Sequence, residues 1–339
     1  MDEQHITIVS GGRLNAGELG FGGTTPPPLT LDVSCQFLKE MVMRILQLFL
    51  ILLIMLPQLL HSQNKNEYSW EYFGQNPPGL EPELFAPGII SEGGRIHCFP
   101  TFSSNNDEVY WMILPPKILF SKYENNKWTK PEVPTFSKEI FCLRPFISYD
   151  NQKIYFASNL PDGYGNLDIW YIEKTDTGFS KPKNIGTPVN TDKFEAQQTI
   201  AENGNIYYTG YVEGKRWSRG IICSRYENGR YKNPEIFGEP INIIDTNAVD
   251  YTPFISKDES FLLFCSNRHN ITLEDCRIYI CFKDSKDNWG EPININNIMG
   301  FDFDSRDPYV SPDQKYLFFS CGGNIYWVST KIIDNIKID

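Results

Sequence analysis

The sequence predicts an all-β fold: a β-propeller of four-stranded antiparallel blades, with five blades expected and six as the alternative. The first observation is a repeated phrase, which reads RPFISYDNQKIYF at 144–156, TPFISKDESFLLF at 252–264 and DPYVSPDQKYLFF at 307–319. Weaker copies lie at 198–208 and 100–110. The matching positions Pro100, Pro145, Gln198, Pro253 and Pro308 are 45, 53, 55 and 55 residues apart. A repeat of about 50 residues is typical of an array of one supersecondary unit.

The second observation is that each repeat contains the same succession of strand signals. A short apolar run reaches a Ser-x-Asp turn, such as Ser148 to Asp150, whose side chains bond to the nearby backbone. Runs of β-branched and aromatic residues follow, as at 154–157 and 168–171. Each complete repeat then carries an aromatic residue with proline three positions later: Trp128/Pro131, Phe179/Pro182, Tyr231/Pro234 and Trp289/Pro292. Because proline cannot donate to a sheet, it indicates an outer strand. A sandwich of irregular strands is the alternative, but it does not require five copies of one phrase.

The third observation concerns how the ring closes. Complete repeats run near 97–135, 142–190, 195–242 and 250–300, whereas the last repeat, 305–332, lacks its outer strand. The segment 83–92 precedes the first repeat and belongs to none. Because open strand edges promote aggregation, we expect this segment to complete the last blade, which gives five blades. Six blades would require residues 66–96 to form more than one strand.

The N-terminal region predicts export. Met43 and Arg44 precede the apolar run ILQLFLILLIML, and Ser62 lies just before the expected cleavage point at Gln63. A basic start, a short apolar core and a small residue are typical of a secretory signal peptide. We therefore expect a periplasmic or secreted protein, the alternative being an inner-membrane anchor formed by residues 43–60. We assign residues 1–40 to an unstructured or mis-assigned start, 41–62 to the signal peptide, 63–80 to a linker, 81–333 to the propeller and 334–339 to a tail.

Composition restricts the class of partner. The formal net charge is −11, and removing residues 1–62, with five acids and three bases, leaves −9. An acidic chain of this kind is not expected to bind nucleic acid through a basic face. We expect a monomer that contacts a membrane only through an uncleaved signal segment. The seven cysteines after residue 62 leave a disulfide open, since an odd number leaves at least one thiol unpaired.

Motifs for chemistry are missing from the sequence. It contains no GxSxG, HExxH or CxxC motif, no P-loop and no dinucleotide fingerprint, and only two histidines follow residue 62. A Ser-His-Asp triad would need one of these histidines beside a nucleophile and an acid. We therefore assign no catalytic residue, no metal site and no cofactor.

The phrases SPDQKYLFFS, NLDIWYIEK and FSKPKNIGTPVN resemble the WD40-like (PD40) repeat of TolB-like propellers. The chain is most similar to secreted propellers of unassigned function from Bacteroidetes-type bacteria, over about residues 81–333. The resemblance implies the fold. It implies little about function, because related repeats occur in TolB itself, in peptidase propeller domains and in polysaccharide lyases. The repeat at 195–242 departs from the pattern, since Ala201-Glu-Asn-Gly replaces its Ser-x-Asp turn.

Charged residues near the start of the first strand of each repeat form the main candidate site. Arg144, Glu195, Asp250 and Arg306 come from different repeats, and propeller symmetry is expected to bring them to one mouth of the central channel. The alternative is that they stabilise the scaffold as ion pairs. Loops after the second strands form another candidate surface, where Tyr164 and Trp217 could stack on sugar rings.

Two functions are consistent with these features. The first is a non-catalytic binding module for a protein or glycan of the bacterial cell envelope. The second is an exported carbohydrate-active hydrolase or lyase with its site at the channel mouth. Two close carboxylates aimed into an open pocket would favour the hydrolase, and a channel plugged by ion pairs would favour the binding module.

Overall fold

The computed structural model describes residues 43–44, 71–243, 248–268 and 275–336. The predicted start segment 1–40 therefore lies outside the described residues. So do residues 63–70 of the predicted linker and all of the predicted signal peptide except Met43 and Arg44. The described residues from 71 onward belong to one compact unit. No helix in the described ranges is long and apolar enough to cross a membrane.

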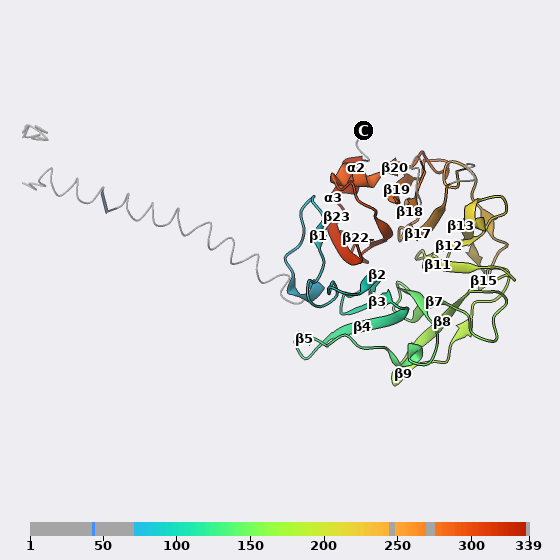
Figure 1. The fold of residues 1–339 in the computed structure, drawn as a ribbon, viewed down its shortest axis with the longest axis horizontal. Coiled ribbons are helices and arrows are strands. Elements are labelled where there is room, and N and C mark those ends of the chain that lie inside the picture. The colour runs from blue at the N-terminus through green and yellow to red at the C-terminus, as the bar shows by residue number, and fades with distance from the viewer. Residues whose placement is uncertain (1–42, 45–70, 244–247, 269–274, 337–339) are drawn as a thin grey trace, which may run out of the picture. The chain divides into compact units, whose positions relative to one another are not determined.

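The described residues form a ring of five four-stranded antiparallel blades, as predicted (Figure 1). Blade 1 contains β2 (Ile96–Phe102), β3 (Glu108–Leu114), β4 (Lys117–Glu124) and β5 (Lys127–Trp128). Blade 2 contains β6 (Leu143–Ile147), β7 (Lys153–Ser158), β8 (Asp168–Thr175) and β10 (Lys183–Asn184), with β9 (Gly178–Phe179) also paired to β8. Blade 3 contains β11 (Glu195–Ile200), β12 (Ile206–Tyr211), β13 (Arg219–Ser224) and β16 (Glu235–Ile236).

Blade 4 contains β17 (Asp250–Ile255), β18 (Phe261–Ser266), β19 (Arg277–Phe282) and β20 (Ile293–Asn294). Blade 5 contains β21 (Arg306–Val310), β22 (Tyr316–Cys321), β23 (Asn324–Ser329) and β1 (Glu83–Leu84). A separate hairpin of β14 (Tyr226–Glu227) and β15 (Arg230–Tyr231) lies between β13 and β16 in the chain. The short helices are η1 (Glu71–Gly74), η2 (Thr135–Ser137), η3 (Arg216–Ser218), α2 (Ile295–Met299) and α3 (Lys331–Ile336).

The expected closure by segment 83–92 is confirmed. Strand β1 pairs antiparallel with β23, with Glu83 opposite Trp327 and Leu84 opposite Tyr326. The next residue, Phe85, is fully buried, with its ring centroid 4.9 Å from that of Phe318 and 5.1 Å from that of Trp327. Between residues 71 and 95 the structure has one strand only, so the six-bladed alternative is wrong.

The assignment of residues 63–80 to a linker needs a correction. Tyr72 in η1 is buried, and its ring lies 5.1 Å from that of Tyr316 and 5.6 Å from that of Trp327. The Tyr72 hydroxyl donates a hydrogen bond to Asp313 at 3.2 Å. The two-residue strand β1 covers little of β23, so aromatic side chains from before it complete the core of blade 5. At the other end, α3 continues past residue 333 to Ile336.

Repeated polar residues hold each blade in shape. The predicted Ser-x-Asp turns form, with Ser148 Oγ donating to Asp150 at 2.5 Å, and the turns in blades 4 and 5 match it. Buried asparagines fix the outer segment of three blades to the third strand, as when Asn190 Oδ1 accepts from the Ile169 amide at 2.9 Å. Asn242 and Asn296 accept equivalent bonds from Ile221 and Ile278. These bonds satisfy backbone groups that short outer strands leave unpaired.

Several cysteines are small core residues. Cys98, Cys142, Cys223, Cys265 and Cys281 are buried free thiols, and Cys321 is a partly buried one. Burial raises the pKa of the Cys223 and Cys281 thiols to about 12. A thiol that stays protonated is a poor nucleophile and a poor metal ligand. In the described part of the chain, no group of three His, Cys, Asp or Glu residues has an arrangement suited to a metal ion.

Candidate functional site

The four charged residues predicted for the channel mouth do not occupy equivalent positions. Every first strand has one break in its pairing register, as between Leu143 and Phe146 in β6. The residues at the equivalent place of this bulge, all with φ between 49° and 60°, are Phe99, Arg144, Gln197, Thr252 and Asp307. Only Arg144 belongs to the predicted set. Glu195 and Asp250 lie two positions before the bulge, and Arg306 lies one position before it.

The five bulged residues line the central channel. A left-handed backbone costs a non-glycine residue about 1–2 kcal/mol, so its recurrence in all five blades shows that the fold requires it. The bulge re-aims each side chain, since an extra residue in a strand interrupts the alternation between faces. The channel cavity, with a volume of about 30 Å³, is lined by these residues and by the register positions that follow them.

The channel is filled by its own side chains. The Arg144 guanidinium lies over the Phe99 ring at 4.3 Å, and the Gln197 side-chain amide lies against the guanidinium. Asp307 Oδ2 accepts a hydrogen bond from Ser320 Oγ at 2.8 Å. Burial raises the pKa of Asp307 to about 6, although the charge of Arg144 acts to lower it. A cavity needs roughly 10–15 Å³ for each water, so about 30 Å³ has room for two or three waters and for no sugar ring.

The described lining of the channel cavity contains one acid, whereas glycoside hydrolysis uses two. Glycosidases act through two carboxyl groups roughly 5–9.5 Å apart. Among the described residues that line the cavity, Asp307 is the single acid. Glu195 is buried and engaged, since its carboxylate accepts hydrogen bonds from the Thr191 amide at 3.0 Å and from Thr191 Oγ1 at 2.5 Å. Burial raises the pKa of Glu195.

Asp250 holds a buried ion triad. Its carboxylate lies 2.8 Å from Lys215 Nζ and 2.7 Å from Arg268 Nη2, and all three side chains are buried. The same carboxylate accepts hydrogen bonds from the Ile243 amide at 3.0 Å and from Ser266 Oγ at 2.7 Å. These contacts join blade 3 to blade 4, so the geometry of Asp250 is that of a scaffold residue.

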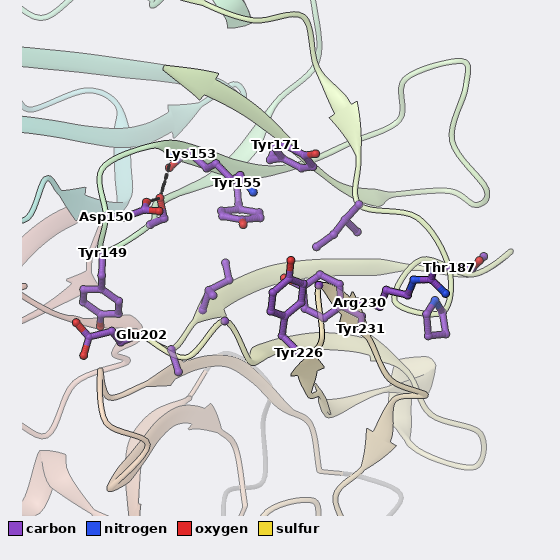
Figure 2. A pocket seen from close by; sticks show the side chains of 17 residues that line it. Tyr149, Asp150, Lys153, Tyr155, Tyr171, Thr187, Glu202, Tyr226, Arg230 and Tyr231 are labelled. Atoms are coloured by element: carbon purple, nitrogen blue, oxygen red, sulfur yellow. Dashed lines mark hydrogen bonds between the residues drawn. The ribbon is translucent and has the colours of Figure 1, made fainter. Parts of the chain in front are cut away.

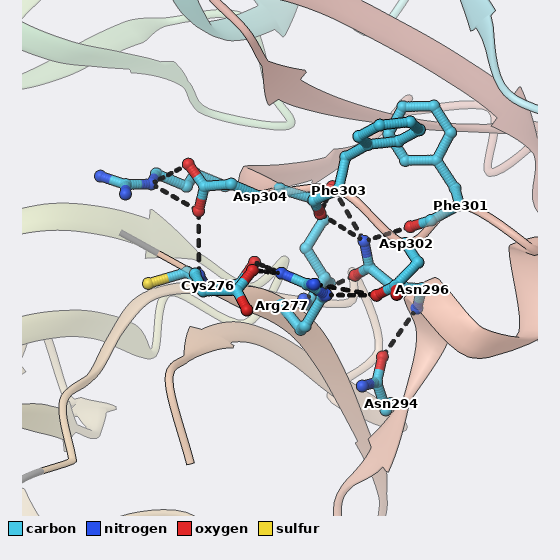
Figure 3. Close-up of polar contacts among 12 residues, drawn as sticks. Cys276, Arg277, Asn294, Asn296, Phe301, Asp302, Phe303 and Asp304 are labelled. Atoms are coloured by element: carbon cyan, nitrogen blue, oxygen red, sulfur yellow. Dashed lines mark hydrogen bonds and ion pairs between the residues drawn. The ribbon is translucent and has the colours of Figure 1, made fainter. Parts of the chain in front are cut away.

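Arg306 is paired beside the channel. Its Nε lies 3.0 Å from Asp304 Oδ2, and Asp304 Oδ1 accepts a hydrogen bond from the Cys276 amide at 2.9 Å. Figure 3 shows Asp304 joined to Cys276, whose neighbour Arg277 binds Asp302 at 2.8 Å. This network fastens the start of β19 to the segment before β21. The structure thus leaves Arg144 inside the channel and places Glu195, Asp250 and Arg306 in separate polar contacts.

Tyr164 and Trp217, predicted as sugar-stacking residues, are exposed by 54% and 57%. They lie in the connections β7–β8 and β12–β13, next to each other in the ring of blades. Arg219 lies over the Phe194 ring at 4.7 Å and 5.9 Å from the Trp217 ring, so one cation lies near the Trp217 side of this surface. No cavity is associated with Tyr164 or Trp217 among the principal pockets of the described residues.

A pocket with a volume of about 670 Å³ lies between blades 2 and 3. Five tyrosines line it, together with two acids and two bases, and we call it the tyrosine pocket. Its lining includes Tyr149, Asp150, Lys153, Tyr155, Tyr171, Thr187, Glu202, Tyr226, Arg230 and Tyr231 (Figure 2). It lies beside the β6–β7 and β11–β12 turns. Because successive connections of an antiparallel sheet alternate between its ends, Tyr164 and Trp217 lie at the opposite end of these blades.

The irregular turn of blade 3 creates one wall of this pocket. Gly204 has φ of +92°, and a Cβ atom there would lie 2.8 Å from Cδ1 of Tyr226. In the other four blades the equivalent turn position carries a side chain: Asn106, Asn151, Glu259 and Gln314. Asn205 Oδ1 accepts a hydrogen bond from the Tyr226 amide at 2.8 Å, which fixes the hairpin above the turn. The Asn228-Gly229 turn between β14 and β15 has positive φ at both residues, as a tight hairpin requires.

The tyrosines form a connected aromatic lining. The ring of Tyr231 lies 4.9 Å from that of Tyr226, and the ring of Tyr155 lies 5.7 Å from that of Tyr171. Burial raises the pKa of Tyr155 and Tyr231 well above the usual value, so both hydroxyls stay protonated near neutral pH. A tyrosine offers a flat apolar ring and a polar tip, so the pocket suits a ligand with both apolar faces and hydroxyl groups.

The acids and the bases of the pocket differ in their contacts with the rest of the protein. Asp150 accepts hydrogen bonds from Ser148 Oγ and from the Gln152 amide, at 2.5 and 2.9 Å. Glu202 lies 2.9 Å from Lys257 Nζ. Lys153 Nζ lies over the Tyr171 ring at 4.9 Å. In the described part of the chain, neither Lys153 nor Arg230 has a carboxylate within ion-pair distance.

Sequence reasoning missed this pocket, although two signals pointed to it. The departure of one repeat from the Ser-x-Asp pattern marks the turn that carries Gly204. The run YENGRY at 226–231 is an Asn-Gly hairpin signal flanked by two tyrosines. Neither signal shows that Tyr155 and Tyr171 of the preceding repeat lie across the same space, because that depends on how the two blades pack.

No known protein family matches the sequence, and no curated protein matches it either. Among solved structures the chain is similar to TolB from Acinetobacter baumannii, with 14% identity and a TM-score of 0.42 over 68% of this chain and 53% of that one. It is also similar to a thermostable family-43 glycoside hydrolase, with 17% identity and a TM-score of 0.48 over 70% and 90%. The α-L-arabinofuranosidase from Lactobacillus brevis is similar as well, with 13% identity and a TM-score of 0.46 over 68% of this chain and 89% of that one. TolB propellers are thus among its structural neighbours, and similarity this distant assigns no function.

Proposed function

We propose that the chain is a non-catalytic binding propeller that holds a carbohydrate chain in the tyrosine pocket. The observation that carries the proposal is a pocket of about 670 Å³ with five tyrosines in its lining, beside a channel that its own side chains fill. Ligand sites in proteins measure about 300–1,000 Å³ and combine aromatic walls with a few placed polar groups. The predicted signal peptide makes the cell envelope or the medium the expected place of binding.

A carbohydrate fits this lining better than a fully apolar ligand does. Sugar rings present C–H faces that pack on tyrosine rings and hydroxyls that bond to polar side chains. Around the rings of Tyr155, Tyr226 and Tyr231, the pocket offers hydroxyls, carboxylates and cations (Figure 2). Truncating an aromatic anchor in such a site costs about 2 kcal/mol or more, which corresponds to at least a tenfold weaker binding.

A glycan array followed by calorimetric titration of the full chain tests the proposal. Tyr226→Ala should weaken binding of the array ligand at least tenfold, because Tyr226 forms part of the wall. Tyr211→Ala is the matched control, since Tyr211 is 39% exposed and Tyr226 is 40% exposed, but Tyr211 lies outside the pocket. Equal affinities of both variants and the wild type, or no glycan bound at all, would contradict the proposal.

The place of action has a separate test. N-terminal sequencing of the protein from its native host should begin near Gln63, as the signal in residues 41–62 predicts. An intact residue 1 on a cytoplasmic product would contradict export without bearing on the pocket.

A further inference from the structure

We infer that the tyrosine pocket selects an acidic sugar, whose carboxylate is bound by Arg230, while Lys153 adds a second positive charge to the pocket. This inference rests on the proposed function and adds the chemical class of the ligand. Its starting point is a contrast within the pocket: the two acids already have partners, whereas the two bases have no ion-pair partner among the described residues.

The two carboxylates already bind groups of the protein, so they are less able to bind a ligand. Asp150 belongs to the turn that joins β6 to β7, and its carboxylate caps that turn through Ser148 and Gln152. Glu202 is compensated by Lys257. The two acids and two bases of the lining sum to zero, and Lys257, which pairs with Glu202 from outside the lining, brings the formal charge of the pocket and this partner to +1. The chain as a whole carries a formal net charge of −11, so this pocket differs in sign from the protein around it.

The positions of the charges suggest how the ligand lies. Figure 2 shows Arg230 beside Thr187 at one end of the pocket, and Glu202 beside Tyr149 toward the other. Arg230 lies on the exposed β14–β15 hairpin, directly before Tyr231. An arginine guanidinium matches a carboxylate with two parallel hydrogen bonds, and lysine adds a point charge. We therefore place the acidic sugar unit near Arg230 and neutral units toward Tyr149.

The lysine is held in a way that suits this role. Lys153 Nζ lies 4.9 Å from the centre of the Tyr171 ring, so the ring positions the ammonium group without neutralising it. The nearby carboxylate of Glu173 interacts electrostatically with Lys153, but its ion pair is with Lys183, at 2.6 Å. A cation held over an aromatic ring beside sugar-stacking walls is available to an anionic group of the ligand.

Two oligosaccharides that differ only in charge test the inference: a glucuronate tetrasaccharide and its carboxyl-reduced form, titrated calorimetrically into the full chain. The acidic sugar should bind at least tenfold more tightly in 50 mM salt. The preference should shrink in 500 mM salt, because screening shortens the reach of charges from about 14 Å to about 4 Å. A tetrasaccharide with sulfate esters in place of carboxylates separates the two anions, and a preference for sulfate would overturn the assignment of a carboxylate.

Arg230→Gln should remove most of the preference while the reduced sugar binds as before. Arg230 is exposed, so this variant is expected to fold. Arg225→Gln is the matched control, because Arg225 is an exposed arginine near the same hairpin that does not line the tyrosine pocket. Equal binding of the acidic and reduced sugars would overturn the inference and leave the proposed function standing. Failure of both sugars, together with an array on which no glycan binds, would overturn both.

Discussion

Replacing Asp250 should lower the stability of the fold rather than remove a ligand. The Asp250 side chain is 0% exposed, and its partners Lys215 and Arg268 are 8% and 5% exposed. Asp250→Asn keeps the size of the side chain but leaves two buried cations without their common carboxylate. Breaking a buried ion pair in this way costs about 3–5 kcal/mol of unfolding free energy.

This loss is large enough to measure by two methods. For a protein of this size, each kcal/mol shifts the melting temperature by about 2–4 °C, so Asp250→Asn should lower it by roughly 6–20 °C. Urea unfolding should show a lower midpoint with an unchanged slope. Asp192→Asn is the control, because Asp192 pairs with Lys193 at the surface, where its side chain is 77% exposed. An exposed pair contributes about 0–1 kcal/mol.

A second substitution tests the cause. In the Asp250→Asn background, Lys215→Met removes one of the two stranded cations and should recover part of the loss. The coupling between contacting residues is typically 0.5–3 kcal/mol, which the double-variant cycle measures. If Asp250→Asn melts like the wild type, the scaffold interpretation is wrong, and a ligand-binding role at the channel mouth becomes the better interpretation.

Three further predictions concern closure, the pocket wall and the channel. Phe85→Ala should lower the unfolding free energy by about 3–5 kcal/mol in urea, because Phe85 is fully buried in the closing blade; a loss below 1 kcal/mol would contradict closure through this segment. Gly204→Ala should weaken ligand binding by displacing Tyr226, whereas Gly214→Ala, also at positive φ but with open space around it, should leave affinity unchanged; equal affinities would contradict the wall. Burial raises the pKa of Asp307 from 3.8 to about 6, so the native state binds this proton more tightly. The unfolding free energy should therefore fall by up to about 3 kcal/mol between pH 4 and pH 6.5, and Asp307→Asn should abolish that component of the slope.

The repeats were enough to predict the fold, its antiparallel blades and the closing role of segment 83–92. They carry this information because strand composition and turn residues act locally, and the ring then follows from repetition. The burial of Tyr72 was not predictable, because it depends on the space left beside the two-residue strand β1. The sequence around Tyr72 has no repeat and no periodic pattern to place it in a core.

The candidate site was predicted less well, because the sequence does not show which residue of each first strand faces the channel. The channel-facing residue of each repeat directly precedes the register position, as Arg144 precedes Pro145 and Asp307 precedes Pro308. We expected Glu195 and Asp250 there because they are charged, but a bulge, rather than the charge, decides which side chain faces the channel. The tyrosine pocket depends on contacts between two blades, which single-repeat patterns do not contain. Whether Arg144, Glu195, Asp250 or Arg306 binds any ligand remains a prediction for mutagenesis.

A crystal structure of the full chain with its best array glycan tests the central claim most directly. We predict electron density for sugar rings between blades 2 and 3, against Tyr155, Tyr226 and Tyr231, with an acidic group beside Arg230. Density for the glycan in the channel around Arg144, or on the loops of Tyr164 and Trp217 with the tyrosine pocket empty, would contradict it.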